Sequence, residues 1–160
     1  GCGYCQKNEE NNCVFNDDAV NETALKMAGA DGIILGSPVY YSGIAGTMKS
    51  FLDRVFYSKS KYFRYKVCTA VAAVRRSGGV DTFHQLNNYF NLGEMIIVPS
   101  HYWSVIHGRK PGEVLQDDEG IQTIREVGKS MAWLMKSLEA SKGEVEKPEK
   151  EERKWTHFIR

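Results

Sequence analysis

Short, continuous apolar runs alternate with longer helical stretches along this chain, and this alternation constrains the fold more than any other feature. The runs at residues 32–36, 66–74 and 94–99 lack the period-two pattern of a half-exposed strand, as expected of strands covered on both faces. Strands that alternate with helices in this way predict right-handed crossovers and a parallel sheet with helices on both faces. The predicted fold class is therefore α/β.

Four helices are predicted from apolar residues that recur every three or four positions. The first begins after Asp17 and Asp18, which cap a helix N-terminus, and it ends at Gly29. The third ends at Gly93. The inward-facing residues of the second, third and fourth helices are Met48, Phe51, Leu52, Val55 and Phe56, then Phe83, Leu86 and Phe90, then Ile121, Ile124, Val127, Met131, Leu134 and Leu138.

The length and charge of the chain restrict its organisation and partners. Its 160 residues fit one domain at residues 1–142, followed by a charged tail at 143–160 whose end Trp155, Phe158 and Ile159 would anchor. With 21 basic against 20 acidic residues, there is no general field for nucleic acid or an anionic membrane, so we expect a small-molecule partner. No apolar run approaches the roughly 18 residues of a membrane span, and the start lacks signal-peptide features, so a cytoplasmic protein is expected.

Three loops follow the carboxyl ends of the predicted strands, where open α/β sheets bind ligands. They are residues 37–47, 74–82 and 99–112. In the first, Gly43 allows close approach of a ligand to the backbone, and Tyr40 and Tyr41 offer stacking faces, as a planar aromatic ligand requires. The alternative is an ordinary strand-to-helix turn whose tyrosines cover the rim of the core. The pattern alone leaves both interpretations open.

Residues 30–41 and 48–54 resemble the NADPH-dependent FMN reductase family, as do residues 2–5, 13–18, 75–79 and the pair at 102–103. The resemblance implies a flavodoxin-like sheet of order 2-1-3-4-5, of which this chain would carry the third, fourth and fifth strands. It also implies FMN as cofactor, NAD(P)H as co-substrate, and a homodimer or higher homo-oligomer with flavin sites near the interface. The family begins with a strand and a Ser/Gly-rich phosphate loop that this chain lacks, so we expect the N-terminal portion of the domain to be missing.

The resemblance also assigns positions in the flavin site, and no catalytic acid or base is among them. Arg75 or Arg76 would stabilise the reduced flavin or bind a nucleotide phosphate, although solvated loop arginines are the alternative. Tyr102, Trp103 and His107 would shape a flat substrate pocket, unless they pack only in a dimer interface. Lys49, Asp53 and Arg54 match the family too but are interpreted as surface and helix–sheet ion pairs. One side of the flavin ring would contact Pro38, Val39, Tyr40, Tyr41, Ser42 and Gly43. The other edge of the ring would contact Arg75, Arg76, Gly78 and Gly79. The substrate would contact Tyr102, Trp103 and His107.

Three of the four cysteines, Cys2, Cys5 and Cys13, lie close together in the sequence. With a further cysteine just upstream, they would resemble the four-thiolate spacing of iron-sulfur flavoproteins, which are relatives of this reductase family. Three thiols do not complete a cluster, and inert or redox-sensitive thiols are the favoured interpretation, with no metal assigned. Cys68 belongs to a buried strand and is predicted to be part of the core.

The leading functional hypothesis is an FMN-dependent NAD(P)H oxidoreductase. It would pass electrons to a flavin, quinone, nitro or azo acceptor, with the protein supplying placement and electrostatics. The alternatives are an iron-sulfur flavoprotein and a non-enzymatic flavodoxin-like electron carrier that exchanges electrons with a protein partner. The basic character of the loops disfavours the carrier, since acidic patches around the flavin would suit it better.

Overall fold

The structure is a computed structural model that describes residues 1–156 and 158. Its sheet contains the strands β1 (Gly32–Tyr40), β2 (Gly43–Ile44), β3 (Val67–Val74), β4 (Ile96–Ile97) and β5 (Val105–His107). They lie in the order β2-β1-β3-β4, and β5 also pairs with β3. β3 is parallel to β1, β4 and β5, whereas β2 folds back antiparallel onto β1.

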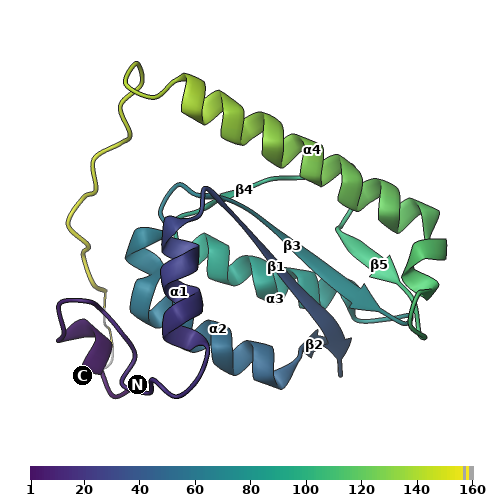
Figure 1. Cartoon of the computed structure of the whole chain (residues 1–160), viewed down its shortest axis with the longest axis horizontal. Coiled ribbons are helices and arrows are strands. Elements are labelled where there is room, and N and C mark those ends of the chain that lie inside the picture. Colours follow the sequence, from purple (N-terminus) through teal and green to yellow (C-terminus); the bar gives the residue numbers. More distant parts are fainter. Residues whose placement is uncertain (157, 159–160) are drawn as a thin grey trace.

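Helices cover both faces of this sheet (Figure 1). The helices α1 (Val20–Gly29), α2 (Gly46–Lys59) and α3 (Gly79–Leu92) lie on one face, and α4 (Asp118–Ala140) crosses the other. Short 3-10 turns occupy Tyr4–Gln6, Ser60–Tyr62 and Glu113–Gln116. The four predicted helices and the predicted α/β class are confirmed.

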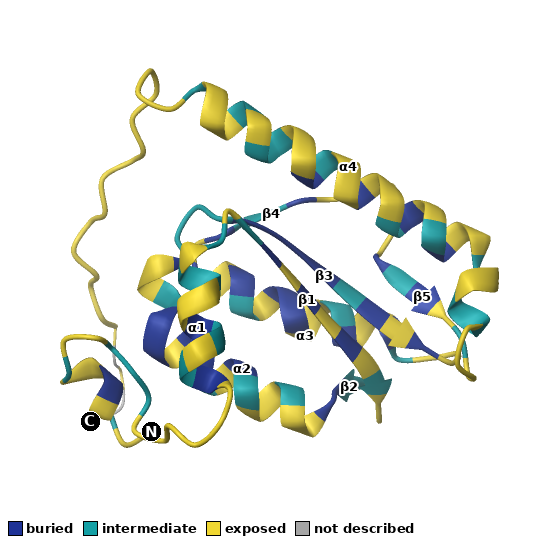
Figure 2. Ribbon diagram, in the orientation of Figure 1, coloured by how far each residue is buried: buried dark blue, intermediate teal, exposed yellow. Residues whose placement is uncertain are grey.

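Two apolar clusters, one on each side of the sheet, hold these layers together (Figure 2). The larger lies between the sheet and α1, α2 and α3, and includes the fully buried Leu52, Phe63 and Phe90. The smaller joins Val67 and Val98 to Val127 and Met131 of α4. Cys68 is fully buried in the larger cluster, as predicted.

The first strand continues beyond the predicted end at residue 36. Ser37 pairs with Ala72 and Pro38 with Ala73, so β1 extends to Tyr40 and enters a tight turn into β2. Proline at this position is compatible with a strand because, among the described residues, Pro38 has a strand neighbour on one side only. The proline therefore marks an edge position and does not end the strand.

Coverage of β1 also differs from the prediction. The exposed fraction of Ile34 is 63%, whereas Ile33 and Leu35 beside it are each 5% exposed. The reason is that α4 packs on Val67 and Val98, at the β3 side of the sheet. The prediction of two covered faces is right for β3, whose residues are mostly buried, and wrong for β1.

The third predicted strand is divided in two. β4 pairs with the beginning of β3, and β5 pairs with its end. Val98 and Ser104 still bond to the main chain of β3, and residues 99–103 leave the sheet between them. The prediction of a loop over residues 99–112 missed β5 because three residues are too few to show a strand period.

The tail after α4 is irregular and runs from the end of α4 down to the neighbourhood of the N-terminal loop (Figure 1). Arg64 donates a hydrogen bond to the Pro148 carbonyl. Trp155 and Phe158 are both exposed, so their predicted anchoring role is wrong, and Ile159 lies outside the described residues. No helix in the described part of the chain is long and apolar enough to span a membrane.

Candidate functional site

The carboxyl ends of β1, β3 and β5 lie side by side at one edge of the sheet (Figure 1). The register pairs Pro38 with Ala73, and Val74 with His107. Since neighbouring strands are about 4.8 Å apart, the three loops predicted from the sequence emerge next to one another. Tertiary structure thus brings together strand ends that are more than 30 residues apart in the chain.

The turn at residues 40–43, here called the 40–43 turn, has an unusual backbone. Tyr41 and Ser42 have φ angles of 49° and 56°, so two non-glycine residues are left-handed, a conformation that costs each of them roughly 1–2 kcal/mol. Tyr40 pairs with Gly43 across the turn. Strain of this kind persists only where surrounding contacts hold it. Tyr40 is 63% exposed and Tyr41 is fully exposed, which leaves both rings available for stacking.

Side chains from two other parts of the fold hold the turn. The buried Ser37 hydroxyl accepts a hydrogen bond from the Ala45 amide at 3.0 Å. Gln85 of α3 accepts from the Ile44 amide through Oε1 and donates to the Ser42 carbonyl through Nε2, each at 3.2 Å. The sequence reasoning missed Gln85, since no local pattern shows that a helical residue faces a turn more than 40 positions earlier.

The two glycines of the second loop fill a space that tolerates no side chain. Gly78 has a φ of 86°, and a Cβ atom there would lie 2.7 Å from the Ser42 hydroxyl. A Cβ atom on Gly79 would lie 2.5 Å from Val105 of β5. The loop is therefore wedged between the 40–43 turn and β5. Arg75 and Arg76 are exposed beside it, and neither forms an ion pair with any residue that the structure describes.

The third loop presents aromatic side chains and a histidine–carboxylate pair. Tyr102 and Trp103 are exposed and meet edge to face, with ring centroids 4.8 Å apart. His107 Nδ1 lies 3.2 Å from Asp117 Oδ2, and Asp117 also accepts hydrogen bonds from the His107 and Gly120 amides. Burial opposes ionisation of Asp117, but these hydrogen bonds outweigh it and hold its pKa below the ordinary value. The sequence reasoning did not single out Asp117, although an aspartate before a helical period is a recognisable cap signal.

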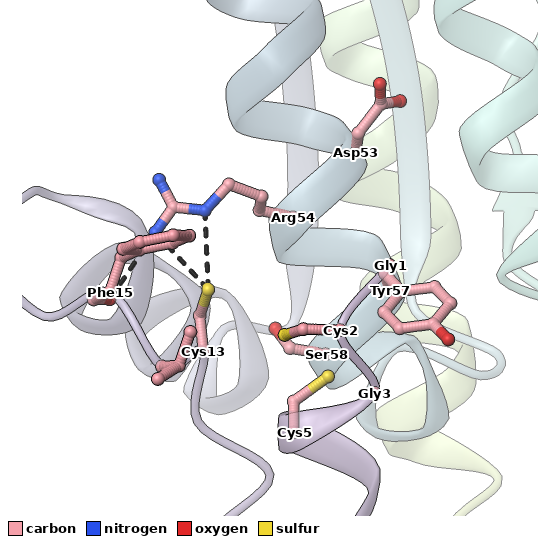
Figure 3. A pocket seen from close by; sticks show the side chains of 11 residues that line it. Gly1, Cys2, Gly3, Cys5, Cys13, Phe15, Asp53, Arg54, Tyr57 and Ser58 are labelled. Atoms are coloured by element: carbon pink, nitrogen blue, oxygen red, sulfur yellow. Dashed lines mark hydrogen bonds between the residues drawn. The ribbon is translucent and has the colours of Figure 1, made fainter.

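A separate cavity of about 440 Å³, here called the cysteine cavity, lies between the N-terminal loop and α2 (Figure 3). Cys2, Cys5 and Cys13 all line it, together with aromatic side chains and the second half of α2. The cavity meets α2 at residues 53–58, and the 40–43 turn precedes that helix. At about 1.5 Å per helical residue, roughly 10 to 18 Å of α2 separates the cavity from the helix start.

Arg54 links α2 to the cysteine loop (Figure 3). Its Nε and Nη2 atoms donate to the Cys13 sulfur at 3.4 and 3.3 Å, and it forms an ion pair with Asp18. Arg54 therefore forms an ion pair at the surface, as predicted, and its partner lies in the loop before α1 and not in the sheet. Lys49 and Asp53 form a surface ion pair of 2.6 Å on α2, as predicted.

Thiolates are suitable ligands for a soft metal, but the number of thiols at this cavity is too small for a complete cluster site. Three thiols line one cavity, whereas iron–sulfur clusters are usually held by four. Within the described residues, no three His, Cys, Asp or Glu side chains are gathered closely enough to hold a metal ion. Burial raises the pKa of Cys5 and raises that of Cys68, deep in the core, to about 12, so Cys68 is the least reactive thiol.

A mostly parallel sheet of order β2-β1-β3-β4 with helices on both faces is a flavodoxin-like, doubly wound α/β fold, and such folds bind ligands beyond the carboxyl ends of their strands. The chain belongs to the NADPH-dependent FMN reductase family, whose model matches residues 2–110. Membership of this family makes the protein a flavin-dependent oxidoreductase with FMN as its flavin.

Comparison with individual proteins agrees with this assignment. An iron-sulfur flavoprotein of Methanocaldococcus jannaschii is 38% identical over 146 residues, which are 86% of this chain and 74% of that protein. A second iron-sulfur flavoprotein of the same organism is 31% identical over 138 residues, covering 78% of this chain and 68% of its own length. A flavodoxin, WrbA-like protein from Agrobacterium tumefaciens shares the fold with a TM-score of 0.55 at 16% identity, covering 82% of this chain and 92% of that one.

Proposed function

We propose that this protein takes electrons from NADH or NADPH and, using FMN, passes them to a flat small-molecule acceptor such as a flavin, quinone, nitro or azo compound. The observation that carries the proposal is the 40–43 turn, which hydrogen bonds hold at the carboxyl ends of the strands. The exposed Arg75 and Arg76 follow the neighbouring strand β3. When bound, FMN supplies the hydride and electron chemistry. The residues around it supply placement and charge.

The residues present fit a flavin ring. Within the described residues, the main-chain N–H groups of Tyr41 and Ser42 have no hydrogen-bond acceptor, and such donors suit the polar edge of an isoalloxazine. The exposed tyrosine rings beside them offer stacking surface. The turn, residues 38–43, would therefore hold one side of the ring.

Arg75 and Arg76 favour a nicotinamide nucleotide as the electron donor. Both guanidinium groups are exposed and form no ion pair among the described residues, so they are available to a phosphate or to negative charge on the reduced flavin. An electron carrier would dock its protein partner through acidic patches around the flavin, whereas these loops are basic. Tyr102, Trp103 and His107 would shape the acceptor side of the site.

The test uses the protein together with any upstream segment that its gene encodes. FMN should copurify or bind on reconstitution, and NADH or NADPH should be oxidised when a quinone, nitro or azo acceptor is supplied. Arg75→Gln with Arg76→Gln should raise the KM for the nucleotide, whereas Arg125→Gln, an equally exposed arginine on α4, should not. An FMN-loaded protein that oxidises neither nucleotide with any acceptor would refute this proposal.

A second candidate function is an iron-sulfur flavoprotein. It is favoured by three thiols on one cavity and by the names of the relatives. We propose that Cys2, Cys5 and Cys13, which line one cavity but in the described residues are not gathered closely enough to hold a metal, draw together around a cluster whose remaining ligand lies outside these three residues. A bound cluster would supply one-electron transfer. Anaerobically purified protein should then contain iron and acid-labile sulfide, which Cys13→Ser should lose and Cys68→Ala should keep. Protein free of both iron and sulfide would contradict it.

The oligomeric state is a further part of the proposal. We propose a homodimer or higher homo-oligomer in which the aromatic side chains of Tyr102 and Trp103 lie near the interface. Their exposure and the enrichment of aromatic residues at interfaces support this. Sedimentation at micromolar concentration should give at least twice the mass of the polypeptide, and a monomer would contradict it.

A further inference from the structure

Gln85 is hydrogen-bonded to the 40–43 turn and to the residue that follows it, although it lies on the surface helix α3. Its carboxamide accepts from the Ile44 amide and donates to the Ser42 carbonyl. One planar side chain thus bridges the main chain on either side of Gly43. Only a carboxamide of this length supplies one acceptor and one donor in that arrangement.

The backbone around the turn is shaped to admit this side chain. A Cβ atom on Gly43 would lie 3.2 Å from Gln85 Oε1 and 3.5 Å from Nε2, so a larger residue would crowd the carboxamide. On the other side of the turn, Gly78 packs against Ser42 with no room for a side chain. Gln85 and Gly78 therefore restrain the same left-handed pair of residues from α3 and from the loop that precedes it.

We propose that Gln85 is a positioning residue that keeps the 40–43 turn in the conformation that receives the flavin, and that it thereby sets the affinity and reduction potential of FMN. The inference rests on the proposed function, since it takes this turn as the flavin contact. Left-handed Tyr41 and Ser42 relax toward ordinary backbone when their restraints are removed. The affinity for FMN then falls with the fraction of molecules in which the turn is competent.

The test compares three variants of the protein, with any upstream segment that its gene encodes. Gln85→Met has a similar size and makes neither hydrogen bond. Gln85→Glu keeps an acceptor for the Ile44 amide and loses the donor to Ser42. Asn88→Ala lies one turn further along the same exposed face of α3 and serves as the control. The readouts are the Kd for FMN, the flavin reduction potential, and hydrogen exchange of the amides at residues 41–44 in flavin-free protein.

Gln85→Met should weaken FMN binding about tenfold, as expected for loss of two modest hydrogen bonds, and should shift the potential and speed the exchange of these amides. Gln85→Glu should also weaken FMN binding, because a carboxylate oxygen would face the Ser42 carbonyl in place of the donor, and Asn88→Ala should have no effect. Unchanged Kd and potential in folded Gln85→Met would overturn the inference. Wild-type protein that binds no FMN would instead refute the proposed function, and the hydrogen-exchange comparison would still report whether Gln85 holds the turn.

Discussion

Gly78→Ala and Gly128→Ala make the same chemical change at two glycines, and we expect opposite effects on stability. Gly78 has a φ of 86°, and its new Cβ atom would lie 2.7 Å from the Ser42 hydroxyl and 2.8 Å from the Ser42 Cα. Gly128 lies within α4, and no atom beyond its own stretch of helix backbone lies within 4 Å of its added Cβ. The pair separates backbone strain and collision from the mere addition of a methyl group.

The magnitude for Gly78→Ala follows from two contributions. Left-handed backbone costs a non-glycine residue roughly 1–2 kcal/mol, and forcing an extra carbon into packed surroundings costs about 1–3 kcal/mol. The sum of roughly 2–5 kcal/mol is a large part of a typical stability of about 5–15 kcal/mol. At about 2–4 °C per kcal/mol for a chain of this size, the melting temperature should fall by roughly 4 to 20 °C.

Gly128→Ala should instead stabilise the protein by about 0.5–1 kcal/mol, because alanine is the better helix former. Urea unfolding and thermal melts of both variants measure the difference, and FMN titration should show weaker binding for Gly78→Ala alone. A Gly78→Ala protein as stable as the wild type would refute the close packing of this loop against the 40–43 turn.

Three further predictions concern single polar contacts. Asp117→Ala should lower the free energy of unfolding at pH 7 by about 1–2 kcal/mol through loss of the helix cap. Because the folded-state pKa of Asp117 is depressed, this contribution is present above the unfolded pKa near 3.9 and is lost as the pH falls through the lower folded pKa. In urea melts, the stabilities of the wild type and the variant should therefore converge toward pH 2. Arg54→Met removes the donors to the Cys13 sulfur and should change the alkylation rate of Cys13 severalfold while Cys68 stays unreactive, as peptide mass spectrometry would show; equal Cys13 rates would contradict the contact. Ser37→Ala leaves the buried Ala45 amide without its acceptor and should lower the free energy of unfolding in urea by about 1–3 kcal/mol. An unchanged free energy would mean that water replaces the hydroxyl, and it would contradict the prediction.

Local patterns were sufficient to predict the helices and the class of the fold. The three- and four-residue spacing of Leu52, Val55 and Phe56 places them on one helix face by geometry alone, and all three are buried as expected. The glycines that end the first and third helices act within one turn of the chain. Such features depend on neighbours in sequence, so no knowledge of distant contacts is required.

Other features were decided only by the tertiary structure. β1 continues through Pro38 because β3 pairs with it there, and β5 is a strand because the end of β3 is its partner. Gln85 reaches the 40–43 turn across more than 40 residues of sequence, and Arg54 reaches Cys13 across a similar span.

The physical reason for this division is the range of the interactions. Helix periodicity and capping are properties of a few consecutive residues, and the chain of this protein displays them before it folds. Strand pairing, the restraint of a strained turn and the gathering of three thiols around one cavity depend on segments that only the folded sheet and helices bring together. The sequence by itself therefore determined the helices and the α/β class of this protein, and the tertiary structure decided how the loops at the carboxyl ends of the strands are held.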